Sequence, residues 1–299
     1  MSDPIRRIAD AVLYEGYVLW PYRRSALKNR KRWTFGGVYP RAWSERHPDD
    51  PWRLRAEVLV EGEDARVDVR VRFLHVVCRQ AYDADGRAVD ELEAGGARYL
   101  SWEEATEREL SEPGAFRIPA GEEREELDGG ALVRRWNELE GSVDVARDGG
   151  RLGVTITNTT AWRGDSREEA SAHALCSTHA VLRVEDGAFV SPLEAGGCRN
   201  EGLWPCLVGE PPDRSTILAS PIILEEYPQI APESPGELFD GGEIDELLIL
   251  NVLALTDEER EEVRASDPRV RELLDRCESL TPEALLLLHG TSRAPEVAP

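Results

Sequence analysis

The amino-acid sequence predicts an α+β fold, with an antiparallel β-sandwich-like body followed by a helical C-terminal end. Apolar and charged residues alternate over 67–73, turn glycines separate two apolar segments within 141–157, and helix-capping residues recur after position 255. Alternation with a period of two is typical of a strand that has one buried and one solvated face. We therefore divide the chain into an aromatic and basic N-terminal segment packed on the body (1–55), a β-rich body (56–240) and a helical region (241–299).

The N-terminal segment begins with apolar residues at helical spacing over 5–13 and continues as an aromatic stretch over 14–22. Every charged residue in 23–32 is then a cation, in a chain whose net charge is −22. Guanidinium groups make planar bidentate contacts and aromatic rings stack, so we expect this segment to bind a partner. The residues expected in that contact are Tyr22, Arg23, Arg24, Lys28, Arg30, Arg32 and Trp33. The alternative is that these cations pair with the surplus carboxylates of the protein itself.

The body begins near Ala56, and its clearest strand runs over 67–78. Two hairpins are expected, one joining 141–146 to 152–157 through Gly149 and Gly150, the other joining 180–184 to 188–190 through Gly187. The acid-rich residues 101–128 predict a solvated helix and loop. The residues Asn158-Thr159-Thr160 match a glycosylation sequon, but we expect them to be the end of a strand.

In the C-terminal region, capping residues indicate where several helices begin. A capping box opens at Thr256, and Asp267-Pro268 and Thr281-Pro282 each place a capping residue before a proline at the first helical position. Gly290 would close the last helix. Upstream, Ile244, Leu247, Leu248 and Leu255 fit one face of a further helix, although a strand is the alternative for so apolar a segment.

Charge and composition narrow the function classes. A net charge of −22 repels phosphate backbones and anionic membrane surfaces, so we expect no nucleic-acid partner. No apolar stretch is long enough to span a membrane, and the first residues lack the pattern of a signal peptide. The five cysteines are widely spread, which favours reduced thiols and a cytoplasmic location.

One group of histidines and cysteines is a candidate metal-binding site. His173, Cys176 and His179 lie within seven residues, with Cys198 and Cys206 downstream, so His173, Cys176, His179 and Cys198 are the candidate ligands of zinc or another transition metal. A second hypothesis for the same residues is that Cys176 acts as a nucleophile with His179 as its base. The alternative is no cofactor at all, with ordinary buried cysteines and hydrogen-bonded histidines. The acidic segment 233–246 could gather round a hard cation, cap the following helix, or pair with the N-terminal cations.

Three parts of the sequence resemble a known family. They are LYEGY at 13–17 with YRRSALKNR at 22–30, SPIIL at 220–224 with YPQIAPESP at 227–235, and EIDELL at 243–248 with LTDEE at 255–259. They resemble an uncharacterised bacterial accessory-protein family often encoded in gene clusters of high-affinity nickel–iron uptake hydrogenases. The resemblance implies a role in maturation, assembly or cluster delivery, with hydrogenase components as partners. The chain has no paired CxxC ligands of the kind that hold a nickel–iron centre.

Two functions follow as hypotheses. The first is a non-enzymatic accessory or assembly factor that acts through protein–protein contact; the resemblance implies that it acts in nickel–iron hydrogenase maturation. The second is a metal- or thiol-dependent enzyme that uses His173, Cys176, His179 and Cys198. The absence of any recognisable catalytic motif favours the first.

Overall fold

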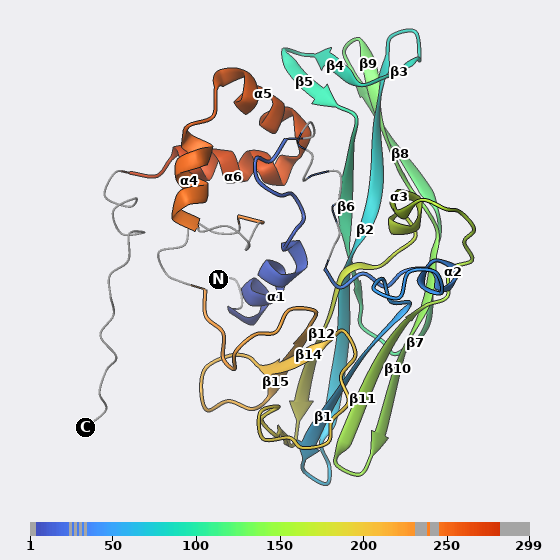
Figure 1. The fold of residues 1–299 in the computed structure, drawn as a ribbon, viewed down its shortest axis with the longest axis vertical. Coiled ribbons are helices and arrows are strands. Elements are labelled where there is room, and N and C mark those ends of the chain that lie inside the picture. Colours follow the sequence, from blue (N-terminus) through green and yellow to red (C-terminus); the bar gives the residue numbers. More distant parts are fainter. Residues whose placement is uncertain are drawn as a thin grey trace.

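The computed structural model describes residues 4–23, 26, 29, 32, 35–230, 238–239 and 245–281. Two antiparallel sheets face one another, and helices cover the outer side of the larger sheet (Figure 1). The five-stranded sheet has the order β13 (Ala188–Phe189), β1 (Arg53–Glu61), β11 (Arg151–Asn158), β10 (Leu139–Asp148) and β7 (Gly114–Ile118).

The eight-stranded sheet is built around one long strand, β2 (Arg66–Asp83). Its order is β14 (Trp204–Leu207), β15 (Thr216–Ser220), β12 (Cys176–Glu185), β2, β9 (Gly130–Trp136) and β8 (Gly121–Leu127), with β3 (Ala88–Val89) and β6 (Trp102–Leu110) also paired to β2. A separate hairpin consists of β4 (Glu91–Ala94) and β5 (Ala97–Leu100). Because β2 pairs with β12, β9, β6 and β3, it connects nearly all parts of this sheet.

The sandwich core lies between the two sheets. Val71 and Phe73 of β2 alternate with solvated or ion-paired residues and pack against apolar side chains of β1 and β11, such as Val58 and Ile156. The Phe73 and Phe116 rings lie 6.3 Å apart, which joins β7 to the same core. The predicted strand at 67–78 is therefore confirmed, with its apolar face turned to the second sheet.

The helices are α1 (Pro4–Tyr14), α2 (Arg41–Ser44), α3 (Arg167–Ser171), α4 (Asp245–Leu253), α5 (Asp257–Ser266) and α6 (Pro268–Glu278). Helix α1 packs Ala9 and Val12 onto Val181 and Leu218 of β12 and β15. Helices α4, α5 and α6 contribute to a second core, which also contains Leu74 of β2. No described helix has both the length and the apolarity needed to cross a membrane.

Several sequence predictions are confirmed. The α+β class with a sandwich-like body and C-terminal helices is correct, and so is the β10–β11 hairpin. Thr256 forms the capping box with Glu259, Asp267 caps α6 ahead of Pro268, and residues 245–253 are helical and not a strand. Asn158 ends β11. Pro282, Gly290 and Ile244 lie outside the described residues.

The prediction of a helix and loop over 101–128 is wrong, because these residues form β6, β7 and β8. The acidic side chains face arginines on the neighbouring strand: Glu122 lies opposite Arg135, and Glu123 lies opposite Arg134. The Arg135 Nε–Glu122 Oε2 distance is 2.6 Å. Cross-strand pairs of opposite charge stabilise a wet strand that has few apolar residues.

The second predicted hairpin is also wrong. Strand β13 does not pair with β12; it crosses to the other sheet, where Phe189 lies opposite Val60 of β1. Strand β12 pairs instead with β2 and β15. The fully buried Phe189 explains the crossover, since its ring enters the core between the sheets.

Candidate functional site

The structure separates the predicted metal ligands. Cys176 opens β12 and is fully buried in the core under the helices, where burial raises the pKa of its thiol to about 12. His179 is also fully buried, three residues along the same strand, and burial lowers its pKa to about 3. Its Nδ1 lies 3.4 Å from the Ser177 carbonyl oxygen. With these pKa values, the Cys176 thiol is protonated and the His179 imidazole is neutral near pH 7. The two side chains therefore do not form a thiolate–imidazolium pair.

His173 and Cys198 lie on other segments. His173 follows α3, and its Nδ1 is 2.9 Å from the Glu169 carbonyl oxygen. Cys198 lies in the loop between β13 and β14. Among the residues that the structure describes, no group of three or more His, Cys, Asp or Glu side chains could hold a metal ion. The four predicted ligands therefore do not form a metal site in the described structure: Cys176 and His179 lie on β12, His173 follows α3, and Cys198 lies in a separate loop.

The described residues of the predicted cationic contact are engaged within the molecule. The Tyr22 hydroxyl donates to the Leu238 carbonyl, and Arg23 pairs with Glu259 of α5 at 3.0 Å. Arg32 is buried, donates from Nε to the Tyr17 carbonyl at 2.8 Å, and lies 4.5 Å from the Trp102 ring. These contacts agree with internal pairing. Arg24, Lys28, Arg30 and Trp33 lie outside the described residues, as does most of the acidic segment 233–246.

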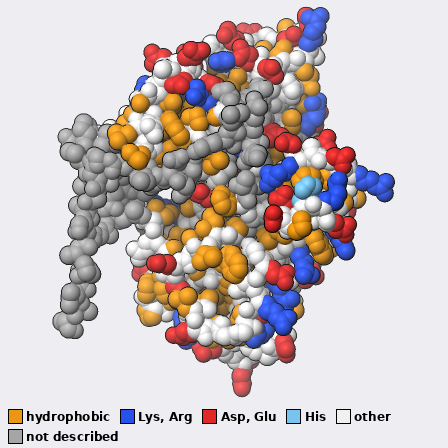
Figure 2. All heavy atoms as spheres, viewed as in Figure 1, with side chains coloured by type: hydrophobic (Ala, Val, Ile, Leu, Met, Phe, Trp, Pro, Cys, Tyr) orange, Lys and Arg blue, Asp and Glu red, His pale blue; other side chains and the backbone are white. Residues whose placement is uncertain are grey.

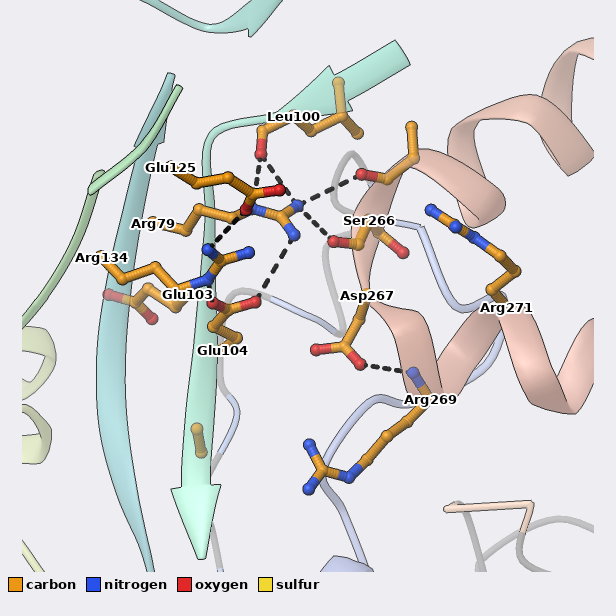
Figure 3. Close-up of polar contacts among 12 residues, drawn as sticks. Arg79, Leu100, Glu103, Glu104, Glu125, Arg134, Ser266, Asp267, Arg269 and Arg271 are labelled. Carbon is orange, nitrogen blue, oxygen red and sulfur yellow. Dashed lines mark hydrogen bonds and ion pairs between the residues drawn. The ribbon is translucent and has the colours of Figure 1, made fainter. Parts of the chain in front are cut away.

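Figure 3 shows the polar network that attaches the C-terminal helices to the large sheet. The buried Arg79 of β2 donates to the Leu100 carbonyl at 2.9 Å and to the carbonyls of Ala265 and Ser266, where α5 ends. It also pairs with Glu104 at 3.4 Å, and Glu104 is held in turn by Arg134 at 2.6 Å. One buried guanidinium therefore connects β2, β5, β6 and the end of α5.

Asp267 completes the network at the α5–α6 junction. Its carboxylate accepts from the backbone N–H of Arg269 at 2.8 Å and from the Tyr17 hydroxyl at 2.6 Å. Both bonds are shielded from solvent, since Tyr17 and Asp267 are each about 1% exposed. The aromatic N-terminal stretch is thereby fixed to the first turn of α6.

A charged cleft of about 690 Å³ opens beside this network. Its walls include Cys78 and Gln80 of β2 and Glu91 and Arg98 of the β4–β5 hairpin. Arg98 already pairs with Glu91, and Arg79 is used by the network, so these cations have partners. The cations that line this cleft are therefore used in contacts within the protein, and we do not take the cleft as the candidate binding site.

A second concavity, which we call the α1 groove, has a different character. It has a volume of about 550 Å³ and lies between α1 and the loops at 209–213 and 228–230. Its apolar residues are Pro4, Ile5, Ile8, Pro228 and Ile230. Figure 2 shows hydrophobic side chains gathered over α1 and the loops beside β14 and β15.

Charged side chains also line the α1 groove: Arg7 on α1, and Glu210 and Asp213 on the facing loop. Arg7 and Glu210 are exposed, and neither makes a side-chain ion pair or hydrogen bond within the described part of the chain. Apolar walls with accessible charges around them are typical of a surface that binds another molecule.

Sequence reasoning did not identify the α1 groove. Its walls lie more than 200 positions apart in the chain, and no local pattern connects Ile5 to Ile230. The weak signal is that Pro228 and Ile230 fall within one of the three family-like stretches.

A scan of the chain against protein-family models finds no match, and neither does a search among curated proteins.

Proposed function

We propose that the protein is a non-enzymatic accessory or assembly factor that binds another protein through the α1 groove. The observation that carries the proposal is the groove itself, whose apolar walls include Ile5, Ile8 and Ile230. Beside these walls lie Arg7 and Glu210, whose side chains make no ion pair or hydrogen bond within the described part of the chain. Burying such apolar walls against a partner removes them from water, and the adjacent charges then select the partner.

The kind of partner follows from charge. The net charge of −22 attracts a protein with a basic surface, and Glu210 and Asp213 provide local acceptors for lysine or arginine side chains. We propose a component of a nickel–iron uptake hydrogenase, or of its maturation apparatus, as this partner. That identification depends on the resemblance of residues 13–30, 220–235 and 243–259 to the accessory family found beside such genes.

Two observations favour this function over a thiol- or metal-dependent enzyme. The buried thiols of Cys176 and Cys206 have pKa values raised to about 12 by burial, so they are poor nucleophiles near neutral pH. Among the residues that the structure describes, the buried imidazole of His179 makes one long hydrogen bond, to the Ser177 carbonyl, and no carboxylate bonds to it that would orient it as a base.

Affinity purification tests the proposal. The tagged full-length chain would be expressed in cells that carry a nickel–iron hydrogenase gene cluster, alongside an Ile230→Asp variant and a Leu193→Asp control. Leu193 is 84% exposed and lies outside the groove, so both variants introduce the same charge into an apolar surface position. We expect a hydrogenase component with the wild type and the control, and at least about tenfold less with Ile230→Asp, because a carboxylate in the apolar wall is costly to desolvate.

Two outcomes would overturn the proposal. If the wild-type protein is recovered without any hydrogenase component, the partner is wrong. If a hydrogenase component is recovered equally with all three proteins, the contact lies elsewhere than the α1 groove.

A further inference from the structure

Among the described residues, three charged side chains line the α1 groove, and two of them are accessible and unpaired. Asp213 is used locally, because its carboxylate accepts from the backbone N–H and the hydroxyl of Ser215, each at 2.9 Å. Arg7 on α1 and Glu210 on the facing loop are exposed, and neither makes a side-chain ion pair or hydrogen bond within the described chain. The groove thus presents one cation and one anion on facing walls, in a chain whose net charge is −22.

Arg7 is the groove residue that a basic partner leaves unexplained. The neighbouring Arg6 is used inside the protein, where its guanidinium lies 3.5 Å from the Glu107 carboxylate and 4.0 Å from that of Asp10. Arg7 instead lies in the wall of the groove, where a surface made of lysine and arginine would repel it. An occupant that suits both walls must bring an anion to Arg7 and a cation to Glu210.

The apolar part of this surface is held in place by the core beneath it. Ile5 and Ile8, one helical turn apart on α1, are partly buried and pack on a cluster that includes side chains of β12 and β15. Leu224 packs on the same cluster, and Ile223, the residue before it, is 75% exposed. The apolar surface therefore continues past the groove over the neighbouring loop (Figure 2). Because packing already fixes these walls, little conformational entropy is lost when they are covered.

A second copy of this chain supplies both charges from the same surface. In a twofold dimer every contact occurs twice with the roles exchanged, so Arg7 of one protomer meets Glu210 of its partner, and Glu210 meets Arg7. The apolar walls are removed from water against the same walls of the partner. The balance of one cation and one anion makes the groove self-complementary, whereas a groove lined by acids alone would repel its own copy.

We propose that the protein forms a twofold dimer through the α1 groove, with two Arg7–Glu210 ion pairs beside an apolar centre. Two chains of net charge −22 repel one another, but salt at physiological ionic strength screens exposed charges separated by more than about 8 Å and weakens contact pairs less. The dimer itself does not depend on the proposed protein partner. Its consequence rests on that proposed function: both contacts use the same walls, so the second copy covers the groove until the partner displaces it.

Sedimentation velocity of the pure full-length chain tests the dimer over a range of micromolar concentrations at physiological ionic strength. We expect a monomer–dimer equilibrium in the wild type. Arg7→Glu and Glu210→Arg each place like charges opposite one another at two points of the interface, and each should weaken the dimer about tenfold or more. The double variant, Arg7→Glu with Glu210→Arg, restores both pairs with their signs exchanged, and its dissociation constant should return to within about threefold of the wild type. Both residues are exposed, so the fold should tolerate these changes.

Arg199→Glu is the matched control, because it changes the net charge by the same amount as Arg7→Glu. Arg199 is exposed, lies outside the groove and makes no side-chain ion pair or hydrogen bond in the described structure, so the control should shift the dissociation constant less than about twofold. A monomer at every concentration, equal weakening by Arg7→Glu and Arg199→Glu, or a double variant no tighter than the single ones would overturn the dimer. The protein partner is tested separately by affinity purification, so either proposal can fail without the other.

Discussion

At the scale of single residues, the internal polar contacts connect positions that are far apart in the chain. Tyr17 reaches Asp267 across 250 positions, and Arg79 reaches Ser266 across 187. Local sequence patterns carry no information on such pairs. The sequence therefore indicated that the N-terminal cations and rings are unusual, while their internal partners became clear only from the fold.

Two buried histidines predict how stability depends on pH. Burial lowers the pKa of His75 to about 4 and that of His179 to about 3, and the neighbouring cations Arg108 and Arg72 lower them further. The unfolded imidazoles titrate near pH 6.5. Below that pH the unfolded chain binds protons that the folded chain does not, so the stabilisation present above pH 6.5 is lost as the pH falls.

The expected loss is roughly 2 kcal/mol per histidine between pH 6.5 and pH 5. Urea unfolding at a series of pH values measures it. His179→Leu should flatten the slope of unfolding free energy against pH, because the leucine does not titrate. A His179→Leu protein with the wild-type slope would show that His179 is not buried in its neutral form.

At the scale of secondary-structure elements, Arg79 predicts how the helices are held. Replacing it as Arg79→Met removes the donors to the carbonyls of Leu100, Ala265 and Ser266. Each buried carbonyl left without a donor costs about 1 kcal/mol or more. Hydrogen exchange followed by mass spectrometry should show faster exchange in α5 and α6, with β10 and β11 unchanged.

The matched control is Arg124→Met on β8. Arg124 is half-exposed and, among the described residues, its ion pair is with Glu126 on the same strand, so its loss should leave the exchange of α5 and α6 at the wild-type rate. Faster exchange spread evenly over sheets and helices in the Arg79→Met protein would contradict a local anchoring role.

The sequence predicted elements well wherever one local rule decided them. Alternation identified β2, and the capping residues Thr256 and Asp267 identified the starts of α5 and α6. It failed over 101–128, where the pairing is decided by arginines on β9 that lie opposite glutamates of β8. It failed again at β13, because Phe189 is placed by the core of the other sheet and not by its own turn.

At the scale of the whole molecule, the candidate sites illustrate the same limit. Three of the four predicted metal ligands lie within seven residues of the sequence, yet the described residues contain no metal site, whereas the walls of the α1 groove are distant in sequence and are brought together by the fold. The sequence shows which residues are close along the chain, such as the histidines and the cysteine at 173–179. It does not show which distant residues the fold brings together, such as those of the α1 groove.

The strand order has a consequence for cutting the chain. Strands β12 and β13, both after residue 175, complete ladders begun by β2 and β1 before residue 84. Two separately produced polypeptides, 1–163 and 164–299, should therefore find one another and restore the native assembly, since each exposes the open edge that the other covers. Size-exclusion chromatography of the mixed halves should show a 1:1 species that elutes with the intact protein. Halves that stay apart would mean that the β2–β12 seam cannot form without the covalent connection.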